Sequence, residues 1–473
     1  MNNRFAYSTF LTFAIALIIN WLPTESLAQN RQKVKKLEAF MEESYRAGQF
    51  SGAVLVAEKG KVIFSKGYGL ANREWNLPNT PDTKFRIGSL TKQFTSLLVM
   101  QLVEKGQLRL DGHISDYLPD YPKVTGDKIT LHHLLTHTSG IPSYTGLPRF
   151  IAETSIRPTT PTAFWSTFAN LPLEFEPGSK FHYSNSGYFL LGAIIEKVTG
   201  KSYAQVLQEN ILRPLHMDNS GYDLPGTVLA KRAAGYQKTP AGFENAPYLD
   251  MTVPYAAGSL YSTVEDLYKW DRALDSDQLL SAASKALMFK PFLNNYGYAW
   301  MTARGVLGKD TLTLVEHNGG INGFGSLLTR IPQDQSLIVV LDNQGGEHLT
   351  EVDRGLLRIL YNQPAAKPKP APTVAAAPTT APKPLGSNAS PLTSYVGKYQ
   401  LAPTFFIAIT AENSQLFLQA TGQSRFELAA ETTGHYSIKE VQADIEFVKA
   451  ASGAVEKLIL HQGGRDLPGV KVE

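Results

Sequence analysis

A serine and a lysine three residues apart could together carry acyl-transfer chemistry. Ser89 and Lys92, in the segment FRIGSLTKQF (85–94), form the single S-x-x-K of the chain. Residues three apart on a helix share one face, so we expect the Ser89 hydroxyl beside the Lys92 amine at a helix start. Oriented N–H groups there suit a negatively charged intermediate. A desolvated lysine loses basicity and can help to take the serine proton. The same pair also fits an ordinary helix start, where serine often caps.

A second candidate pair is Tyr183 and Asn185, in FHYSNSGY (181–188), directly before an apolar helical pattern. A tyrosine beside a cationic lysine can have a lowered pKa and shuttle a proton. An asparagine offers both a donor and an acceptor to a substrate amide. The alternative interpretation is a turn that contains a buried tyrosine.

The densest glycine cluster, HNGGINGFGS (317–326), does not fit a phosphate-binding loop. Its glycines follow a polar His-Asn, no Lys-Ser/Thr ends the run, and the next segment has a strand pattern rather than a helical one. A strand carrying His317 and free backbone N–H groups could instead border a serine site and complete an oxyanion hole.

Other catalytic arrangements are disfavoured. The chain has no G-x-S-x-G elbow, which argues against an α/β-hydrolase, and no H-E-x-x-H. His133 and His137 have a spacing that puts two imidazoles one helical turn apart, but they lack a glutamate and a third ligand. We therefore predict a structural role for these histidines rather than a catalytic metal.

Composition and the N-terminus predict an exported protein. The 473 residues carry a net charge of +3, too small a bias for a nucleic-acid partner. Residues 1–28 combine Arg4, an apolar run too short to span a bilayer comfortably and small residues before Ala28, as in a cleaved signal peptide. An uncleaved anchor is the alternative. The absence of cysteine excludes a lipidated N-terminus and disulfides. We expect a periplasmic or secreted protein with no stable membrane insertion after cleavage.

The chain is predicted to contain a large α+β domain, a linker and a small all-β domain. Residues 29–361 mix helical patterns (92–104 and 187–198) with strand patterns at both ends, so the first and last strands are expected to share one sheet. The linker, 362–391, is rich in proline, alanine and lysine. About eight short strands in 392–473 predict a small barrel-like fold.

Three motifs, Ser89-x-x-Lys92, Tyr183-x-Asn185 and His317-Asn-Gly319, occur in this order. Together they closely resemble the three signature boxes of the penicillin-recognising serine hydrolases, in the class C β-lactamase-like branch. That branch includes DD-carboxypeptidases, D-aminopeptidases and esterases. The resemblance covers about residues 35–361, including LHHLLTHTSGIPSY (131–144) and AAGSLYSTVEDLYKW (256–270). It implies a β-lactamase/transpeptidase-like fold, in which an antiparallel sheet is flanked by helices and joined by an all-helical region.

The resemblance also implies a role for each residue. Ser89 would be the acylated nucleophile, and Lys92 and Tyr183 would share the acid and base work. Asn185 would hold the acyl-side amide of a small-molecule or peptide substrate. His317 would line the site and bias it positive. The set is completed by Asn318 and Gly319 at the substrate and by the backbone N–H groups of Ser89 and Gly320 in the oxyanion hole.

One departure from the family pattern bears on the substrate. The third box reads His-Asn-Gly where dedicated class C β-lactamases carry Lys-Thr-Gly, and Asn318 replaces a hydroxyl that often helps to bind a carboxylate. We therefore expect a D-residue peptidase or esterase. A β-lactamase with slow lactam hydrolysis and a non-catalytic ligand-binding protein are the alternatives. The tail resembles lipocalin-like domains appended to some relatives, and it could shape substrate access or be a passive folding module.

Overall fold

The computed structural model describes residues 30–147, 150–239, 242–368 and 392–472. Within the last range, short gaps fall at 403–404, 413–414, 421–424, 433, 439–442, 451–452 and 463–464. The expected signal peptide and most of the expected linker lie outside the described residues. The chain divides into two compact units, Met1–Ala375 and Ala376–Glu473, each of which is described by itself.

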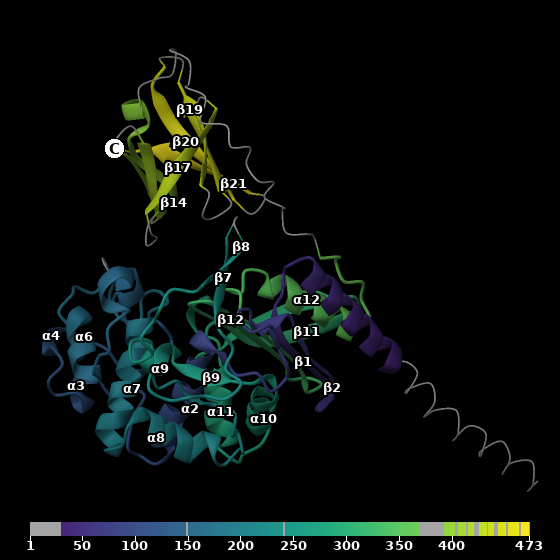
Figure 1. Ribbon diagram of the computed structural model, residues 1–473. Helices are drawn as coiled ribbons and strands as arrows, with labels where there is room; N and C mark the ends of the chain where they lie inside the picture. The colour runs from purple at the N-terminus through teal and green to yellow at the C-terminus, as the bar shows by residue number, and fades with distance from the viewer. Residues whose placement is uncertain are drawn as a thin grey trace, which may run out of the picture. The chain divides into compact units, whose positions relative to one another are not determined.

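A six-stranded antiparallel sheet is the framework of the first unit (Figure 1). Its spatial order is β10-β11-β12-β13-β1-β2. The bounds are β1 (Gly52–Glu58), β2 (Lys61–Tyr68), β10 (Met301–Leu307), β11 (Asp310–Ile321), β12 (Phe324–Ile331) and β13 (Ser336–Asp342). β1 pairs with β13, so the prediction that the first and last strands share a sheet is confirmed. Lys59 and Gly60 join β1 to β2 with positive φ angles of 50° and 72°, which a tight hairpin requires.

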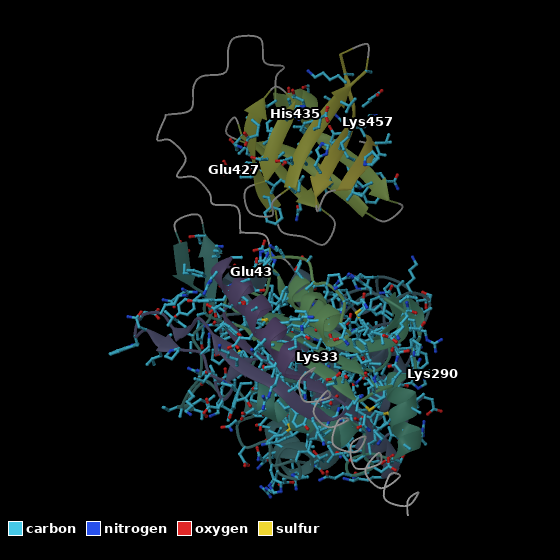
Figure 2. The ribbon with its side chains drawn as sticks, turned by 90° about the vertical axis from the view of Figure 1, so that its right-hand side faces the viewer. Lys33, Glu43, Lys290, Glu427, His435 and Lys457 are labelled. Atoms are coloured by element: carbon cyan, nitrogen blue, oxygen red, sulfur yellow. The ribbon has the colours of Figure 1, made fainter. Side chains whose placement is uncertain are left out.

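Helices cover the two faces of this sheet. A helix over residues 30–46 and α12 (Leu349–Leu360) pack on one face, where alternate strand residues such as Val54 and Val340 enter their core. Lys33 and Glu43 lie along the first of these helices (Figure 2), and Lys33 pairs with Glu58 of β1 at 2.6 Å. The intervening strand residues, such as Leu55, face the second core, because successive side chains point to opposite faces.

The second core belongs to a helical region built around two buried helices, α2 (Thr91–Glu104) and α7 (Asn185–Thr199). Most residues of both helices are buried, as expected of helices inside a large domain. Both confirm predicted helices, and Gly200 ends α7 with a φ of 67°. The other elements of the unit are β3 (Leu70–Asn72), β4 (Leu77–Pro78), β5 (Phe85–Arg86), η1 (Gly88–Leu90), α3 (Ile114–Tyr117), α4 (Lys123–Gly126), α5 (Leu131–Leu135), η2 (Tyr144–Gly146), η3 (Phe150–Thr154), α6 (Pro161–Ala169), α8 (Tyr203–Leu207), η4 (Gln208–Leu212), β6 (Gly221–Tyr222), β7 (Tyr236–Thr239), β8 (Gly242–Asn245), α9 (Tyr255–Gly258), β9 (Leu260–Ser262), α10 (Val264–Leu274), α11 (Ala282–Phe289) and η5 (Leu293–Asn295).

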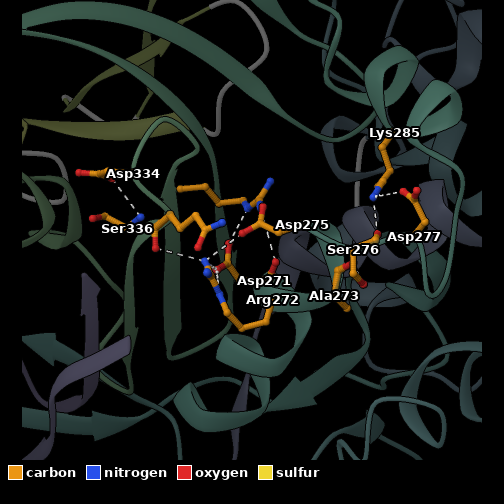
Figure 3. Close-up of polar contacts among 11 residues, drawn as sticks. Asp271, Arg272, Ala273, Asp275, Ser276, Asp277, Lys285, Asp334 and Ser336 are labelled. Atoms are coloured by element: carbon orange, nitrogen blue, oxygen red, sulfur yellow. Dashed lines mark hydrogen bonds and ion pairs between the residues drawn. The ribbon is translucent and has the colours of Figure 1, made fainter. Parts of the chain in front are cut away.

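A buried ion-pair cluster ties α10 to the sheet. Arg330 of β12 bonds to Asp271 and, at 2.6 Å, to Asp275. Arg272 faces the same two carboxylates (Figure 3). Removing one partner of such a cluster leaves an unpaired buried charge, so these contacts hold β12 firmly in place. β12 in turn supports its neighbour β11, which carries the third candidate box.

The second unit is a closed barrel of eight antiparallel strands, preceded by η6 (Leu392–Tyr395). Its strands are β14 (Gly397–Ala402), β15 (Phe405–Glu412), β16 (Gln415–Ala420), β17 (Arg425–Thr432), β18 (His435–Ile438), β19 (Ala443–Lys449), β20 (Val455–Gln462) and β21 (Arg465–Lys471). Alternate residues fill the interior, while Glu427, His435 and Lys457 lie on the outside (Figure 2). The predicted all-β fold of the tail is confirmed.

Candidate active site

Ser89 and Lys92 meet at the entrance to α2. Ser89 lies in the single turn η1, and Lys92 lies in the first turn of α2. Lys92 Nζ is 3.0 Å from Ser89 Oγ, as the spacing predicts. Ser89 is half-buried and lines a pocket, whereas Lys92 is completely buried beneath it. The hydroxyl is therefore reachable from the pocket, and the amine reaches it from inside the protein.

Lys92 has two further partners that fix its orientation. Its Nζ donates to Asn185 Oδ1 and to the Ala257 carbonyl, both at 2.8 Å. Burial lowers the pKa of Lys92 well below its ordinary value. A neutral amine has two hydrogens and one lone pair. Because Asn185 Oδ1 and the Ala257 carbonyl can only accept, they take both hydrogens, and the lone pair is left for the proton of Ser89 Oγ.

The Ala257 carbonyl is held in place by α9, which lies against α2. Thr95 Oγ1 donates to the Ala256 carbonyl at 2.6 Å, and the Leu260 amide donates to Thr91 Oγ1 at 3.1 Å. These two contacts, together with that of Lys92 itself, hold the segment that carries this acceptor against α2. A backbone carbonyl has no side-chain identity, so this part of the site could not be predicted from residue types.

Tyr183 lies over Lys92 and is packed between aromatic rings. Lys92 Nζ is 4.9 Å from the centroid of the Tyr183 ring, and the His137 ring lies 4.1 Å away on centroids. Burial raises the pKa of Tyr183, and the nearby Ser89 side chain opposes this only in part. The expectation of a lowered pKa is wrong, because the phenol is desolvated and the neighbouring lysine is itself buried. A raised pKa favours the protonated phenol, so Tyr183 is better suited to donate a proton than to accept one.

Asn185 begins α7 and is largely committed to protein contacts. Its Oδ1 accepts from Lys92, its backbone N–H donates to Ser143 Oγ at 3.1 Å, and its Nδ2 donates to Thr145 Oγ1 at 3.3 Å. Only the last of these contacts is long and lies in an exposed position. Asn185 can therefore offer a substrate a hydrogen-bond donor, but its acceptor is occupied.

The third box lies on β11 beside η1. Pairing between β10 and β11 stops at Met301 and Glu316, so that edge of β11 beyond Glu316 faces η1. A Cβ at Gly319 would stand 2.2 Å from the Ile87 carbonyl oxygen and 2.9 Å from the Ser89 backbone nitrogen. A glycine is therefore required there for the close approach of the two backbones.

Gly320 has the opposite environment. It is exposed, a Cβ there would meet nothing within 4 Å, and it lines the same pocket as Ser89. Gly88 packs on its backbone, since a Cβ at Gly88 would stand 2.9 Å from the Gly320 carbonyl oxygen. The backbones of Ser89 and Gly320 thus border one space, as an oxyanion hole requires.

His317 is buried behind the pocket rather than lining it. Its Nδ1 is 2.6 Å from the Asn318 carbonyl, which can only accept, so Nδ1 carries the proton. Nε2 then accepts from Tyr296 Oη at 2.8 Å. Burial, with the nearby Lys92, lowers the pKa of His317 to about 3. The expectation that His317 biases the site positive is wrong, because the imidazole is neutral. Asn318 is exposed and does not line the pocket.

His133 and His137 do not share a helical face as expected. α5 ends at Leu135, and His137 has a positive φ of 56°. His133 Nδ1 accepts from the Thr130 amide at the start of α5, whereas His137 Nδ1 accepts from the Ser184 amide at 3.1 Å. His137 therefore supports Tyr183 from below. Across the described ranges, no group of three or more His, Cys, Asp or Glu side chains could hold a metal ion.

The pocket over Ser89 has a volume of about 320 Å³. Its lining comes from η1, η2, η3, α7, β7, α9, β11 and the segments that follow η3, β8 and β11. The lining residues are Ser89, Tyr144, Thr145, Phe150, Ser155, Asn185, Gln237, Pro247, Leu249, Pro254, Ala257, Gly258, Gly320, Ile321, Asn322 and Gly323. The structure therefore brings Ser89, Asn185 and Gly320 to one pocket, with the side chains of Lys92 and Tyr183 packed around the serine.

Comparison with known proteins agrees with this geometry. The Beta-lactamase family matches residues 34–363, and a Domain of unknown function (DUF3471) matches residues 381–471. The chain is 29% identical over 469 residues to Penicillin-binding protein 4* of Bacillus subtilis. The aligned region covers 94% of this chain and 100% of that protein. The chain belongs to the β-lactamase family of serine hydrolases that includes the penicillin-binding proteins.

Solved structures share the fold. A penicillin binding protein from Bacillus halodurans superposes with a TM-score of 0.60 at 29% identity, covering 69% of this chain and 97% of that one. The D-amino acid amidase from Ochrobactrum anthropi, solved with L-phenylalanine amide, gives a TM-score of 0.59 at 26% identity, covering 71% and 98%.

None of the helices in the described ranges combines the length and apolar character needed to cross a membrane.

Proposed function

We propose that the protein is an exported serine hydrolase that cleaves amide or ester bonds through an acyl-enzyme on Ser89. The observation that carries this proposal is the set of three contacts at Lys92 Nζ. Two fixed acceptors, Asn185 Oδ1 and the Ala257 carbonyl, leave the lone pair of a neutral amine facing the serine hydroxyl. Such a buried, desolvated lysine is suited to activate a serine nucleophile.

In the first step, Ser89 Oγ attacks the substrate carbonyl while Lys92 takes the hydroxyl proton. The lowered pKa of Lys92 and the raised pKa of Tyr183 favour the lysine as this first base. Negative charge develops on the former carbonyl oxygen, and we assign its binding to the backbone N–H groups of Ser89 and Gly320, two residues that line the same pocket. Removing one such donor typically costs about 10²–10³ in rate.

In the second step, the carbon–heteroatom bond breaks and the leaving group needs a proton. Tyr183, protonated and adjacent to both Ser89 and Lys92, donates it and regains one from the Lys92 ammonium. The acyl group remains on Ser89 Oγ until water attacks, with the same residues working in reverse. The products are a carboxylic acid and an amine or alcohol, and no metal or cofactor takes part.

For the substrate, we propose D-residue peptides, in the manner of DD-carboxypeptidases and D-aminopeptidases, or small esters. The similarity to a D-amino acid amidase and the His-Asn-Gly of the third box support this choice, within the class C-like branch of the family. Slow β-lactam hydrolysis is the second candidate, supported by the similarity to penicillin-binding proteins. The N-terminal pattern of residues 1–28 supports export to the periplasm or the medium.

A substrate panel on the purified protein tests the proposal. It contains D-amino-acid amides, a D-Ala-D-Ala peptide, p-nitrophenyl esters and a chromogenic cephalosporin, with Ser89→Ala as the control. We expect turnover of an amide or an ester that Ser89→Ala lacks, and slow or incomplete turnover of the cephalosporin. Ligand binding with no turnover and no acylation in any arm would instead favour a non-catalytic binding protein.

A further inference from the structure

The wall of the pocket over Ser89 is apolar. Its apolar lining residues include Tyr144, Phe150, Leu249, Pro254 and Ile321. This wall is firmly supported: the Tyr144 ring is buried, with its centroid 5.4 Å from that of Phe150 and 4.9 Å from that of Phe164 in the helical core. An apolar group that enters the pocket therefore meets a preformed surface.

The polar part of the lining is neutral. It consists of hydroxyl and amide side chains, namely those of Ser89, Thr145, Ser155, Asn185, Gln237 and Asn322. Asn185 is bonded to Lys92 and Thr145, and Asn322 Nδ2 donates to the Pro247 carbonyl at 2.9 Å. No Lys, Arg, Asp or Glu occurs among the described lining residues.

Among the described residues, Lys92 and His317 lie close behind the pocket, and neither supplies it with a charge. Lys92 is completely buried with its amine directed at three protein oxygens, and His317 is buried with both ring nitrogens bonded to Tyr296 and Asn318. Neither side chain is available to pair with a substrate carboxylate. A charged substrate group would lose its hydration in this pocket without gaining a partner.

We infer that the pocket selects an uncharged acyl donor with an apolar side chain and discriminates against acyl groups bearing a carboxylate or an ammonium near the scissile bond. The inference rests on the proposed function and sharpens its substrate class to blocked D-residue derivatives and apolar esters. The volume of about 320 Å³ lies at the lower end of ligand pockets, which suits one side chain plus the reacting carbonyl.

Two matched pairs of p-nitrophenyl esters test the inference, because within each pair the shape is kept and the charge changes. One pair is 5,5-dimethylhexanoate against 4-(trimethylammonio)butanoate, and the other is 6-methylheptanoate against hydrogen adipate. We expect kcat/KM to be about tenfold or more higher for the neutral member of each pair, with the loss appearing mainly in KM. Equal or faster turnover of either charged member would overturn the inference.

A charge introduced at the pocket provides a second test. Gln237 is exposed at the rim, and Gln237→Glu adds a negative charge with little change of shape. The kcat/KM ratio of the trimethylammonio ester to its neutral partner should rise about fivefold, and the ratio for the adipate should fall. Gln107→Glu, an exposed position that does not line this pocket, is the matched control and should change neither ratio.

The outcomes separate the two proposals. A protein that hydrolyses no ester and is not acylated at Ser89 contradicts the proposed function itself. A protein that hydrolyses the esters in a Ser89-dependent manner, but prefers a charged member, contradicts only the inference about the pocket. A Gln237→Glu variant whose two ratios stay at the parent values also contradicts the inference, provided that its melting temperature matches that of the parent.

Discussion

The first unit, called here the hydrolase unit, and the second unit, the barrel, both have apolar cores built on antiparallel strands. They differ in the polar and ionisable side chains that they bury. The hydrolase unit completely buries Lys92 and almost completely buries His137 and His317. In the described part of the barrel, the buried set is aliphatic and aromatic, with hydroxyls such as that of Tyr399, which donates to the Tyr395 carbonyl at 2.8 Å.

This difference indicates where the chemistry lies. Burying an ionisable group is costly unless it is paired or its hydrogen bonds are satisfied, and strongly shifted pKa values cluster at functional sites. The barrel has the interior of a stability module, and the hydrolase unit has a site inside its core. If this is so, substitutions at the site of the first unit should reduce hydrolysis strongly, and substitutions in the barrel should not.

Removing the buried amine should have the largest effect. Lys92→Met keeps the length and the apolar stem but removes the base and the partner of Ser89. General-base catalysis is typically worth about 10²–10⁴ in rate, so we expect the acylation rate to fall by about 10³. Stopped-flow acylation by a p-nitrophenyl ester measures this.

Lys457→Met, on the barrel surface, is the control and should react at the parental rate. An unchanged acylation rate in a folded Lys92→Met protein would show that the buried lysine is not the base.

The two adjacent glycines of β11 should respond very differently to the same substitution. In Gly319→Ala the new methyl would stand 2.2 Å from the Ile87 carbonyl oxygen and would push β11 away from Ser89, whereas in Gly320→Ala it would meet nothing within 4 Å. We expect about a hundredfold loss of kcat for Gly319→Ala, the size of a lost oxyanion contact, and melting temperatures that fall only for that variant. Equal kinetic losses in the two variants would argue against the backbone contact between β11 and η1.

The neutral state of His317 predicts a pH dependence of stability. Its pKa in the folded protein, about 3, lies below the ordinary value of 6.5, so the unfolded chain binds the proton first as the pH falls. The parent should therefore lose stability relative to His317→Gln between about pH 6.5 and 3, by about 1 kcal/mol per pH unit. Denaturant unfolding at several pH values measures this difference.

His435→Gln, at an exposed barrel histidine, should leave that loss in place. If the difference in unfolding free energy between the parent and His317→Gln does not change over this pH range, His317 takes up its proton in the folded protein as readily as in the unfolded chain.

A cavity in the barrel should affect stability without affecting the reaction. Leu428 is completely buried in the barrel, so Leu428→Ala should cost about 2–5 kcal/mol of barrel stability. The kcat/KM for a small ester should stay at the parental value at temperatures where the barrel remains folded. A fall in kcat/KM under conditions where the barrel remains folded would show that the barrel contributes to catalysis, and would contradict the assignment of the chemistry to the first unit alone.

The sequence predicts the local parts of this molecule well. The pairing of Ser89 with Lys92 follows from helical spacing, and the barrel follows from alternating strand patterns. Tyr183 and Asn185 are distant in the chain, and only the resemblance to a family brought them to the same site.

The features that sequence reasoning missed depend on burial and on backbone atoms. The raised pKa of Tyr183 and the neutral His317 arise from desolvation, which composition and spacing do not reveal. The Ala257 carbonyl and the Tyr296 hydroxyl meet their partners only in the folded chain. The imidazoles of His133 and His137 are not one turn apart because α5 ends between them.

The central claim is that Ser89 forms the acyl-enzyme. The direct measurement is intact-mass spectrometry of the full chain after reaction with a fluorophosphonate or a fluorescent penicillin, followed by peptide mapping. We predict one adduct on the peptide that contains Ser89 and no adduct in the Ser89→Ala variant. An unlabelled parent, or equal labelling of Ser89→Ala, would contradict it.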